Sequence, residues 1–485
     1  MKTCKIIIKD EVNIKLDGLD PNTRRKCSDK LKFFLPHAYH MPAYKLGRWD
    51  GTVRFCDVGG RTYLNLLDDL MPIIMKEGYE FRVEDQRQDH GVLEFDEVSE
   101  NYWKDQGVVW PEGHPSEGEP IMLRDYQIEI INKFVENPQA LQEVATGAGK
   151  TIMTATLSHI VEKYGRSIVI VPNKDLVRQT EEDYINCGLD AGVYFGDRKD
   201  YGKTHTICTW QSLNQMLKDT KAGKSDIEAF IEDVVCVMVD EVHQAKADVL
   251  KDLLTSVFAN VPIRWGLTGT IPKEDWNTAS IRASLGNVVH RLAAKTLQDE
   301  GYLSKCHIEV IQTQETAEYS NYQSELKFLL EDKKRLDYMA SRIMEISQTG
   351  NTLVLVDRIN AGKGLQERLP EDVVFVSGDM KTDARKQEYK EINTATNSIT
   401  IATYGVAAVG LNIPRIFNLV MIEPGKSFVR VIQSIGRGVR VAKDKDFVQV
   451  WDMTSRCKFS KRHLTERKKY YKEAEYPFTI NKVTY

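Results

Sequence analysis

A glycine-rich segment in the second quarter of the chain has the chemistry of a phosphate-binding loop. Ala145–Thr151, ATGAGKT, follows an apolar run and opens a helical pattern. Glycines let backbone N–H groups wrap a phosphate, and the N-terminus of a helix adds a favourable dipole. Lys150 is expected to reach the β- and γ-phosphates of a nucleotide, and Thr151 to ligate Mg²⁺. The pattern G-x-x-x-x-G-K-[ST] fails at its first position, Val144, so a plain glycine-rich turn stays as the alternative.

A second chemical group comes about 90 residues later, where the apolar run Val234–Val239 ends in Asp240, Glu241, Val242 and His243. A carboxylate at the end of a buried strand costs several kcal/mol unless it binds a cation or acts as a base. Asp240 is therefore expected to ligate Mg²⁺ and Glu241 to orient an attacking water. No second histidine stands at H-E-x-x-H spacing from His243, which argues against a zinc site.

Short apolar runs alternate with helical patterns on both sides of these groups. This alternation predicts two successive parallel sheets covered on both faces. The expected strands are 141–145, 167–171, 204–209, 234–239 and 264–267, then 307–311, 352–356, 373–376, 398–402, 417–422 and 447–451. Ligands in such sheets bind at the carboxyl ends of the strands, which is where both chemical groups fall.

Composition places the chain among soluble globular proteins. Its 485 residues are 42% hydrophobic and 28% charged, which excludes wholesale disorder and predicts about three domains. Val234–Val239 is far too short to cross a bilayer, and no signal peptide is visible. Eight cysteines without a C-x-x-C pair fit a reducing compartment. A cytoplasmic protein without membrane contact is expected.

The net charge of −4 hides an uneven distribution. Residues 1–60 carry twelve Lys/Arg and seven Asp/Glu, residues 84–120 carry two and eleven, and residues 456–472 carry eight and one. Such runs are most often solvated surface, but a basic head and tail also suit contact with nucleic acid. The acidic stretch, with Pro111, Pro115 and Pro120, predicts a linker.

The basic head has a feature of its own near residue 50. Asp50-Gly51 between residues 44–49 and 52–57 predicts a β-hairpin with a type I′ turn. The side chains expected around it, suited to phosphate contact and base stacking, are Lys45, Arg48, Trp49 and Arg54. The alternative is that Trp49 and Tyr44 fill a small core. A zinc site of Cys27, His37, His40 and Cys56 is disfavoured, because their spacing matches no common pattern.

In their order along the chain, these segments resemble the superfamily 2 helicases. The matching segments are 124–127, 145–151, 171–174, 209–212, 240–243, 267–270, 353–357, 403–405 with 410–412, and 433–440. The resemblance implies two RecA-like domains that close on ATP, with Arg437 and Arg440 supplied across the cleft as arginine fingers. It implies ATP contacts by Arg124, Gln127, Thr146, Gly147, Ala148, Gly149, Lys150, Thr151 and Gly410. It implies nucleic-acid contacts by Pro172, Asn173, Lys174, Thr209, Trp210, Gln211, Thr403 and Tyr404.

Residues 40–54 and 77–79 are also similar to the N-terminal domain of phage recombination helicases. This resemblance implies ATP-driven remodelling of forks, Holliday junctions, duplexes and RNA–DNA hybrids in recombination and replication, with recombination and single-strand-binding proteins as expected partners. Two departures are Thr268-Gly269-Thr270 in place of Ser/Thr-Ala-Thr, and Lys273 where a related branch has arginine, since lysine lacks the planar two-pronged contact.

The expected architecture is α/β: two tandem RecA-like parallel-sheet domains preceded by a small α+β N-terminal domain. The expected boundaries are 1–95 for the N-terminal domain, 96–120 for the linker, 121–303 and 304–460 for the RecA-like domains, and 461–485 for a basic tail. Three alternatives stay open: an RNA helicase, the double-strand translocase motor of a restriction complex, and a nucleic-acid-binding scaffold with a relic ATP site.

Overall fold

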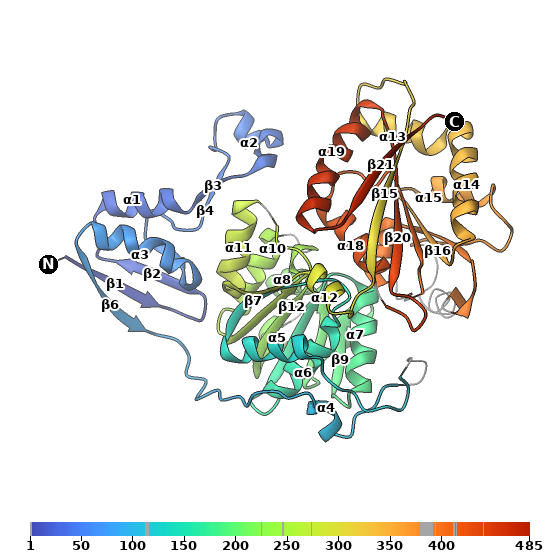
Figure 1. The fold of residues 1–485 in the computed structure, drawn as a ribbon. Helices are drawn as coiled ribbons and strands as arrows, with labels where there is room; N and C mark the ends of the chain where they lie inside the picture. The colour runs from blue at the N-terminus through green and yellow to red at the C-terminus, as the bar shows by residue number, and fades with distance from the viewer. Residues whose placement is uncertain are drawn as a thin grey trace. The chain divides into compact units, whose positions relative to one another are not determined.

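A computed structural model describes most of the chain (Figure 1). The described residues are 2–111, 116–224, 226–244, 247–272, 274–378, 391, 392, 394–410, 413, 415–439 and 441–485. They divide into two compact units. The first unit holds residues 1–144 and 149–291, and the second holds residues 145–148 and 292–485.

The first unit begins with a small sheet of four strands in the order β5-β2-β1-β6. Its strands are β1 (Lys2–Ile8), β2 (Asn13–Asp17), β5 (Arg61–Tyr63) and β6 (Tyr79–Asp85). Helices α1 (Pro21–Lys30) and α3 (Leu67–Lys76) bury their apolar side chains against Cys4, Ile6 and Leu16 of this sheet. Helix α1 begins at Asp20, whose carboxylate accepts the backbone N–H groups of residues 22 and 23. The expected α+β head is present.

The predicted hairpin around Asp50-Gly51 is wrong. Strand β4 (Thr52–Arg54) pairs with β3 (Lys32–Phe34), antiparallel, with Phe34 opposite Thr52. The intervening residues contain a 3₁₀ helix, η1 (Pro36–His40), and the short helix α2 (Pro42–Lys45) in place of the expected first strand. Pro36 and Pro42 each stand in the first turn of a helix, where proline favours helix over strand.

The segment 96–120, expected as a linker, packs along the first unit where the structure describes it. It contains helix α4 (Tyr102–Asp105), and Trp103 is only 1% exposed. The Trp103 indole donates to Thr156 Oγ1 at 2.8 Å and stacks on His159, with ring centroids 5.3 Å apart. Both partners belong to helix α6 (Lys150–Val161), which follows the glycine-rich loop.

The main sheet of the first unit has eight strands in the order β10-β9-β11-β8-β12-β13-β7-β14. They are β7 (Gln139–Val144), β8 (Arg166–Val171), β9 (Ala191–Phe195), β10 (Arg198–Asp200), β11 (His205–Thr209), β12 (Val234–Asp240), β13 (Ile263–Thr268) and β14 (Val288–Leu292). The connecting helices are α5 (Asp125–Glu136), α6, α7 (Lys174–Asn186), α8 (Trp210–Lys221), α9 (Ile227–Ile231), α10 (Ala247–Asp252) and α11 (Asp275–Leu285), with short turns η3 (Val242–Gln244) and η4 (Leu253–Val257). The five strands expected from the sequence are confirmed, and neighbours among them pair in parallel.

Helix α11 is shared between the main sheet and the N-terminal sheet. Its Ile281 and Leu285 belong to the main core, whereas Ala279 and Ala283 are buried in the core of the N-terminal sheet. Arg282 of the same helix pairs with Asp69 of α3, with 2.9 Å between Nη1 and Oδ2. The N-terminal sheet therefore packs directly on the main-sheet fold of the first unit.

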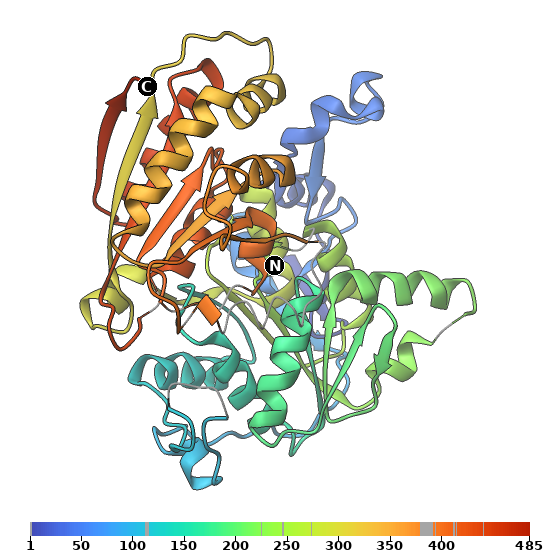
Figure 2. The same ribbon diagram turned by 90° about the vertical axis from the view of Figure 1, so that its right-hand side faces the viewer.

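The second unit contains a seven-stranded sheet in the order β17-β18-β16-β19-β20-β15-β21. Its strands, which pair in parallel, are β15 (Lys305–Thr313), β16 (Thr352–Val356), β17 (Val374–Val376), β18 (Ile399–Thr403), β19 (Asn418–Ile422), β20 (Phe447–Ser455) and β21 (Phe478–Val483). Its helices are α12 (Ala294–Asp299), α13 (Tyr322–Glu331), α14 (Lys333–Ser347), α15 (Ile359–Gln366), α17 (Tyr404–Gly410), α18 (Phe428–Gly438) and α19 (Lys458–Glu473). Helices α14 and α15 cover one face of this sheet, and α18 and α19 lie on the other (Figures 1 and 2).

The basic segment 461–485 is part of this fold and not a separate tail. Strand β21 pairs with β15 along six residues, and Arg467 and Tyr471 of α19 are fully buried. The Arg467 guanidinium binds both carboxylate oxygens of Asp452, at 2.8 and 2.9 Å. A charge run counted along the sequence does not reveal that one of its arginines is paired inside the core.

Candidate nucleotide site

Five motif segments each follow a strand of the first unit's main sheet, and they begin at one edge of that sheet. Strands β11, β8, β12, β13 and β7 are consecutive neighbours in the sheet and pair in parallel, so their carboxyl ends share that edge. The segments that follow these strands begin at Trp210, Pro172, Glu241, Gly269 and Ala145. The edge is the place where ligands bind in open parallel sheets.

The glycine-rich loop has the backbone geometry of a phosphate cradle. Gly147 and Gly149 adopt φ of 92° and 80°, a region that other residues rarely occupy, and Gly149 caps helix α6. A Cβ on Gly149 would lie 2.8 Å from Nε2 of Gln127. The buried Gln127 amide, expected to contact ATP, therefore lies against the loop, and its Oε1 accepts the N–H of Arg124 at 3.0 Å.

Lys150 and Glu241 form a buried ion pair at this edge, with 2.6 Å between Nζ and Oε1. Glu241 is a non-glycine residue at φ 53°, directly after strand β12. Its burial raises the pKa of the carboxyl, but the charge of Lys150 and the hydrogen bonds from Lys150 and the Gly269 N–H outweigh burial and lower the pKa. Glu241 is thus a carboxylate at neutral pH, as orientation of a water requires.

His243 joins the acidic segment to the one after β13, a link that the sequence interpretation missed. Its Nδ1 lies 2.6 Å from Thr268 Oγ1 and 3.5 Å from Glu241 Oε2. Since the Thr268 hydroxyl donates its single proton to the Thr270 carbonyl at 2.7 Å, Nδ1 carries the hydrogen and donates. Burial lowers the pKa of His243 to about 4 against the opposing charge of Glu241, so the imidazole is neutral near pH 7.

The proposed magnesium ligands fit the ion by type. Thr151 is the second residue of α6 and is partly exposed, and Asp240 ends β12, with Oδ1 accepting the Glu241 N–H at 2.9 Å. A hydroxyl directly after the glycine-rich loop and a carboxylate at the end of β12 are oxygen ligands that Mg²⁺ accepts while it keeps waters and phosphate oxygens. Among the described residues no group of three His, Cys, Asp or Glu is placed to hold a metal ion.

The nucleic-acid residues expected after β8 and β11 divide into structural and exposed ones. Asn173 caps α7 by accepting two backbone N–H groups, and Thr209 caps α8. Pro172 is buried, and its carbonyl accepts Gln211 Nε2 at 3.3 Å. Lys174 and Gln211 are exposed at the same edge.

Trp210 packs against the main core of the first unit, and its indole Nε1 is buried without a hydrogen-bond partner among the described residues. Of the residues expected after these two strands, Lys174 and Gln211 have exposed side chains at the edge, and Gln211 also donates to the Pro172 carbonyl.

In the second unit, the structure gives Thr403 and Tyr404 internal roles. Tyr404 is 4% exposed and donates its hydroxyl to the Ile422 carbonyl at 3.1 Å, so its ring does not stand free to stack on a base. Arg430 of α18 lies over that ring and pairs with Asp357 at 2.6 Å. Thr403 Oγ1 accepts the Val406 N–H at 3.5 Å.

Three of the expected ATP-site residues fall at the limit of the described structure. Gly410 ends α17, and Arg437 lies on α18 with its side chain outside the described part. Arg440 lies outside the described residues altogether, as does Lys273. Their roles rest on the resemblance.

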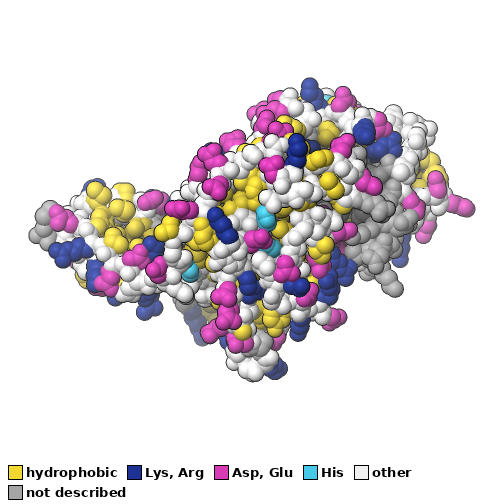
Figure 3. Space-filling view, turned by 90° about the horizontal axis from the view of Figure 1, so that it is seen from below, with side chains coloured by type: hydrophobic (Ala, Val, Ile, Leu, Met, Phe, Trp, Pro, Cys, Tyr) yellow, Lys and Arg dark blue, Asp and Glu magenta, His cyan; other side chains and the backbone are white. Residues whose placement is uncertain are grey.

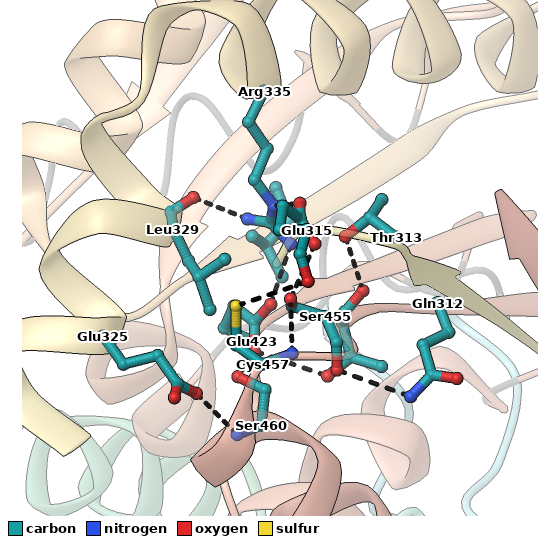
Figure 4. Close-up of polar contacts among 12 residues, drawn as sticks. Gln312, Thr313, Glu315, Glu325, Leu329, Arg335, Glu423, Ser455, Cys457 and Ser460 are labelled. Atoms are coloured by element: carbon teal, nitrogen blue, oxygen red, sulfur yellow. Dashed lines mark hydrogen bonds and ion pairs between the residues drawn. The ribbon is translucent and has the colours of Figure 1, made fainter. Parts of the chain in front are cut away.

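A buried network of charges occupies the carboxyl ends of β15, β19 and β20 (Figure 4). Arg335 of α14 pairs with Glu315 at 2.9 Å and with Glu423 at 2.8 Å. Glu423 Oε2 also accepts the Ser460 hydroxyl of α19 at 2.9 Å, and burial, which outweighs Arg335, raises its pKa. Because buried charges are tolerated only when they are paired, this network fixes α14 and α19 to the sheet.

The residues of the N-terminal head that were expected to contact nucleic acid also divide into those with internal partners and those that are exposed. Arg54 Nη1 contacts Ser28 Oγ and Asp29 Oδ1, both at 3.1 Å, and Trp49 donates its indole N–H to the Thr52 carbonyl at 2.9 Å. Lys45 and Arg48 are exposed. On the face in Figure 3, Lys/Arg and Asp/Glu side chains are interspersed.

Comparison with known proteins agrees with the geometry. The family described as type III restriction enzyme, res subunit, matches residues 120–273, and the helicase conserved C-terminal domain matches residues 312–442. The first match spans strands β7 to β13, and the second spans strands β16 to β19. The chain belongs to the superfamily 2 helicases. Helicases of this superfamily hydrolyse ATP, which agrees with the loop, lysine and glutamate at the sheet edge.

Relatives of this superfamily 2 helicase include the ATP-dependent DNA helicase uvsW of Enterobacteria phage T4, which is 21% identical over 96% of this chain and 93% of its own. The putative DNA 3'-5' helicase Rad25 of Haloarcula marismortui is 23% identical over 68% of this chain and 52% of its own.

Among solved structures, a fragment of a putative HsdR subunit of a type I restriction enzyme from Vibrio vulnificus aligns with a TM-score of 0.55 at 14% identity, over 97% of this chain and 84% of its own. The type ISP restriction-modification enzyme LlaBIII aligns with a TM-score of 0.57 at 13% identity, over 84% of this chain and 33% of its own. At this identity the likeness concerns the fold. In the described part of this helicase, no helix is both long and apolar enough to cross a membrane.

Proposed function

We propose that this helicase uses ATP hydrolysis to remodel branched DNA: to regress forks, migrate branches and unwind duplexes or R-loops during phage recombination and replication. The similarity to a phage DNA helicase supports this, because it extends over 96% of the chain and so includes the N-terminal head. Partners would be forked, four-way, duplex and single-stranded DNA or RNA–DNA hybrids, together with recombination and single-strand-binding proteins.

The observation that carries the proposal is the buried Lys150–Glu241 pair on the cradle edge. In this assignment Lys150 moves to the β- and γ-phosphates of ATP when the nucleotide binds, and Glu241 is released to orient water. Thr151 and Asp240 would hold Mg²⁺, which supplies charge neutralisation at the phosphates. Arg437 and Arg440 would contribute positive charge to the transition state, an effect on the order of 10³–10⁵ in rate for an arginine finger.

The link from Glu241 toward the N-terminal head supports coupling of hydrolysis to DNA. Glu241 Oε2 accepts the Gly269 N–H at 3.3 Å, and His243 ties it to Thr268. The chain then runs from Thr270 to α11, whose Ala279 and Ala283 lie in the N-terminal core. A change at the γ-phosphate can therefore reach the head by a short path. The path consists of the hydrogen bond from Gly269 to Glu241, the chain from Gly269 to α11, and the packing of α11 on the head.

The test is ATP turnover by the full-length chain with single strands, forks, four-way junctions, RNA–DNA hybrids and RNA. The proposal expects DNA to stimulate turnover, and forks or junctions to be converted to product only with ATP. Stimulation by RNA alone would instead identify an RNA helicase. Turnover without any response to nucleic acid would contradict the proposal.

A second candidate, a translocase that moves on duplex without separating strands, is favoured by the match of residues 120–273 to the restriction-enzyme res subunit. Displacement of a triplex-forming strand from an unbranched duplex measures such movement. Triplex displacement that is much faster than fork unwinding would favour the translocase.

A further inference from the structure

Between β3 and β4 the chain displays aromatic and aliphatic side chains to solvent. We call residues 34–51 the aromatic lobe. Phe34 is 39% exposed, Tyr39 58%, Met41 39% and Leu46 65%. Exposed apolar side chains gathered in one place mark interaction surfaces in folded proteins.

The lobe holds these side chains in a defined arrangement without a core of its own. The rings of Phe34, Tyr39 and Tyr44 contact one another, with centroids 5.1, 5.8 and 5.4 Å apart. Gly51 lies beneath them at φ 76°, and a Cβ there would be 2.5 Å from the Phe34 ring. The Leu35 N–H donates to the Gly51 carbonyl at 2.8 Å and closes the base of the lobe.

Charge at the lobe indicates the class of its partner. Residues 21–54 carry eight Lys/Arg and two Asp/Glu. Both acids are engaged by Arg54, at 3.1 Å for Asp29 and 3.8 Å for Asp50. Within the described part of the chain, Lys45 and Arg48 form no ion pair and are exposed next to the rings. Aromatic rings with exposed basic side chains beside them suit nucleic acid. The rings stack on nucleobases, and the ammonium or guanidinium groups bind phosphates.

The lobe also lies on the same compact unit as Lys150 and Glu241. His37 contacts the ring of Trp276, with centroids 6.2 Å apart, and Trp276 is the second residue of α11. Helix α11 follows the segment that binds Glu241 through Gly269. A ligand bound to the lobe would therefore have a fixed position relative to strand β13 and the loop that follows it.

We propose that the aromatic lobe binds the open end of a duplex at a DNA branch, with Tyr39 and Leu46 stacked on the exposed terminal base pair and Lys45 and Arg48 on the flanking phosphates. This rests on the proposed function. A continuous duplex has no exposed base-pair face, and a single strand lacks the paired platform. The lobe thus selects duplex ends, including those at junctions between single and double strands, where it resists re-pairing.

The experiment uses the full-length chain and the double variant Tyr39→Ser, Leu46→Ser, with Val58→Ser, Met75→Ser as the matched control, since Val58 and Met75 are equally exposed outside the lobe. Binding is measured to a fork, a single strand and a blunt duplex, with 2-aminopurine in the terminal pair of the fork. We expect the lobe variant to bind the fork about tenfold more weakly, the size of one lost stacking contact. Single-strand binding and single-strand-stimulated turnover stay unchanged. A lobe variant that carries Tyr39→Trp in place of Tyr39→Ser regains fork binding.

Three outcomes overturn the proposal. Fork binding unchanged in the lobe variant means that the lobe does not contact the branch. Equal loss on the fork and the single strand means that the lobe is not selective for a duplex end. A 2-aminopurine signal that does not change between lobe variant and wild type means that no side chain stacks there. If wild type itself shows no DNA-stimulated turnover, it is the proposed function that fails, because that readout does not involve the lobe.

Discussion

Asn65 of the N-terminal head donates its side-chain amide to Oε1 of Gln139 at 2.7 Å. Gln139 is the first residue of β7, the strand that leads into the phosphate cradle, and its own Nε2 donates to the Glu11 carbonyl at 2.7 Å. The head therefore contacts the beginning of the strand whose other end leads into the glycine-rich loop that we propose binds ATP. This contact and the shared helix α11 make the head an integral part of the first unit and not a domain attached only by a linker.

The Lys150–Glu241 pair predicts separable losses. Lys150→Ala should weaken ATP binding by at least about tenfold, because the phosphates lose their cation. Glu241→Gln should keep binding and reduce turnover by about 10²- to 10⁴-fold, because an amide cannot accept a proton. Titration calorimetry with ATP and a phosphate-release assay measure the two effects. Equal ATP affinity of Lys150→Ala and wild type would contradict the assignment, and Lys174→Ala, at the same edge but outside the cradle, is the control.

Removal of residues 1–85 should destabilise the first unit. Ala279 and Ala283, which are 4% and 0% exposed in the head's core, would face water. Gln139 would lose two hydrogen-bond partners. We expect a lower thermal midpoint and a lower soluble yield than for the full chain. Ala279→Lys, Ala283→Glu in the truncated chain should recover solubility by resurfacing α11. A truncated chain that melts like the full one would show that the head is independent.

Trp103 should anchor the acidic segment to the P-loop helix. Trp103→Ala removes a fully buried ring and should cost about 3–5 kcal/mol of stability. Trp103→Phe keeps much of the ring but loses the hydrogen bond to Thr156, so it should cost less. Urea unfolding followed by intrinsic fluorescence and circular dichroism compares the variants. A cost near zero for Trp103→Ala would mean that the segment detaches in solution.

His463 of α19 predicts a loss of stability in acid. Burial, together with the nearby charges of Arg467 and Lys426, lowers its pKa to about 4. Unfolded histidine titrates near 6.5, so between about pH 6.5 and 4 the unfolded chain binds a proton that the folded chain refuses. The contribution is full above pH 6.5 and is lost as pH falls toward 4. Calorimetric melting from pH 7 to 4.5 should show a smaller fall in midpoint for His463→Gln than for wild type or for the exposed-site control His40→Gln.

The strands and the cradle could be predicted from the sequence because their signals are local. Apolar runs such as Val234–Val239 form strands buried on both faces, and the glycines at 147 and 149 permit a backbone that few other residues adopt. The spacing from Lys150 to Glu241 already implied one sheet edge, since parallel strands bring their carboxyl ends together.

What only the tertiary structure decided are the partners of side chains distant in sequence. Asp50-Gly51 satisfies a hairpin rule locally, yet β4 pairs with β3 because Phe33 and Val53 pack on the core that surrounds Phe55 and Leu31. Tyr404 has the type of a base-stacking residue, but its hydroxyl meets Ile422 inside the second unit. His243 gains its role only when folding brings Thr268 beside it. The physical reason is the same in each case: burial and hydrogen-bond satisfaction depend on long-range contacts, which a local pattern of residue types does not contain.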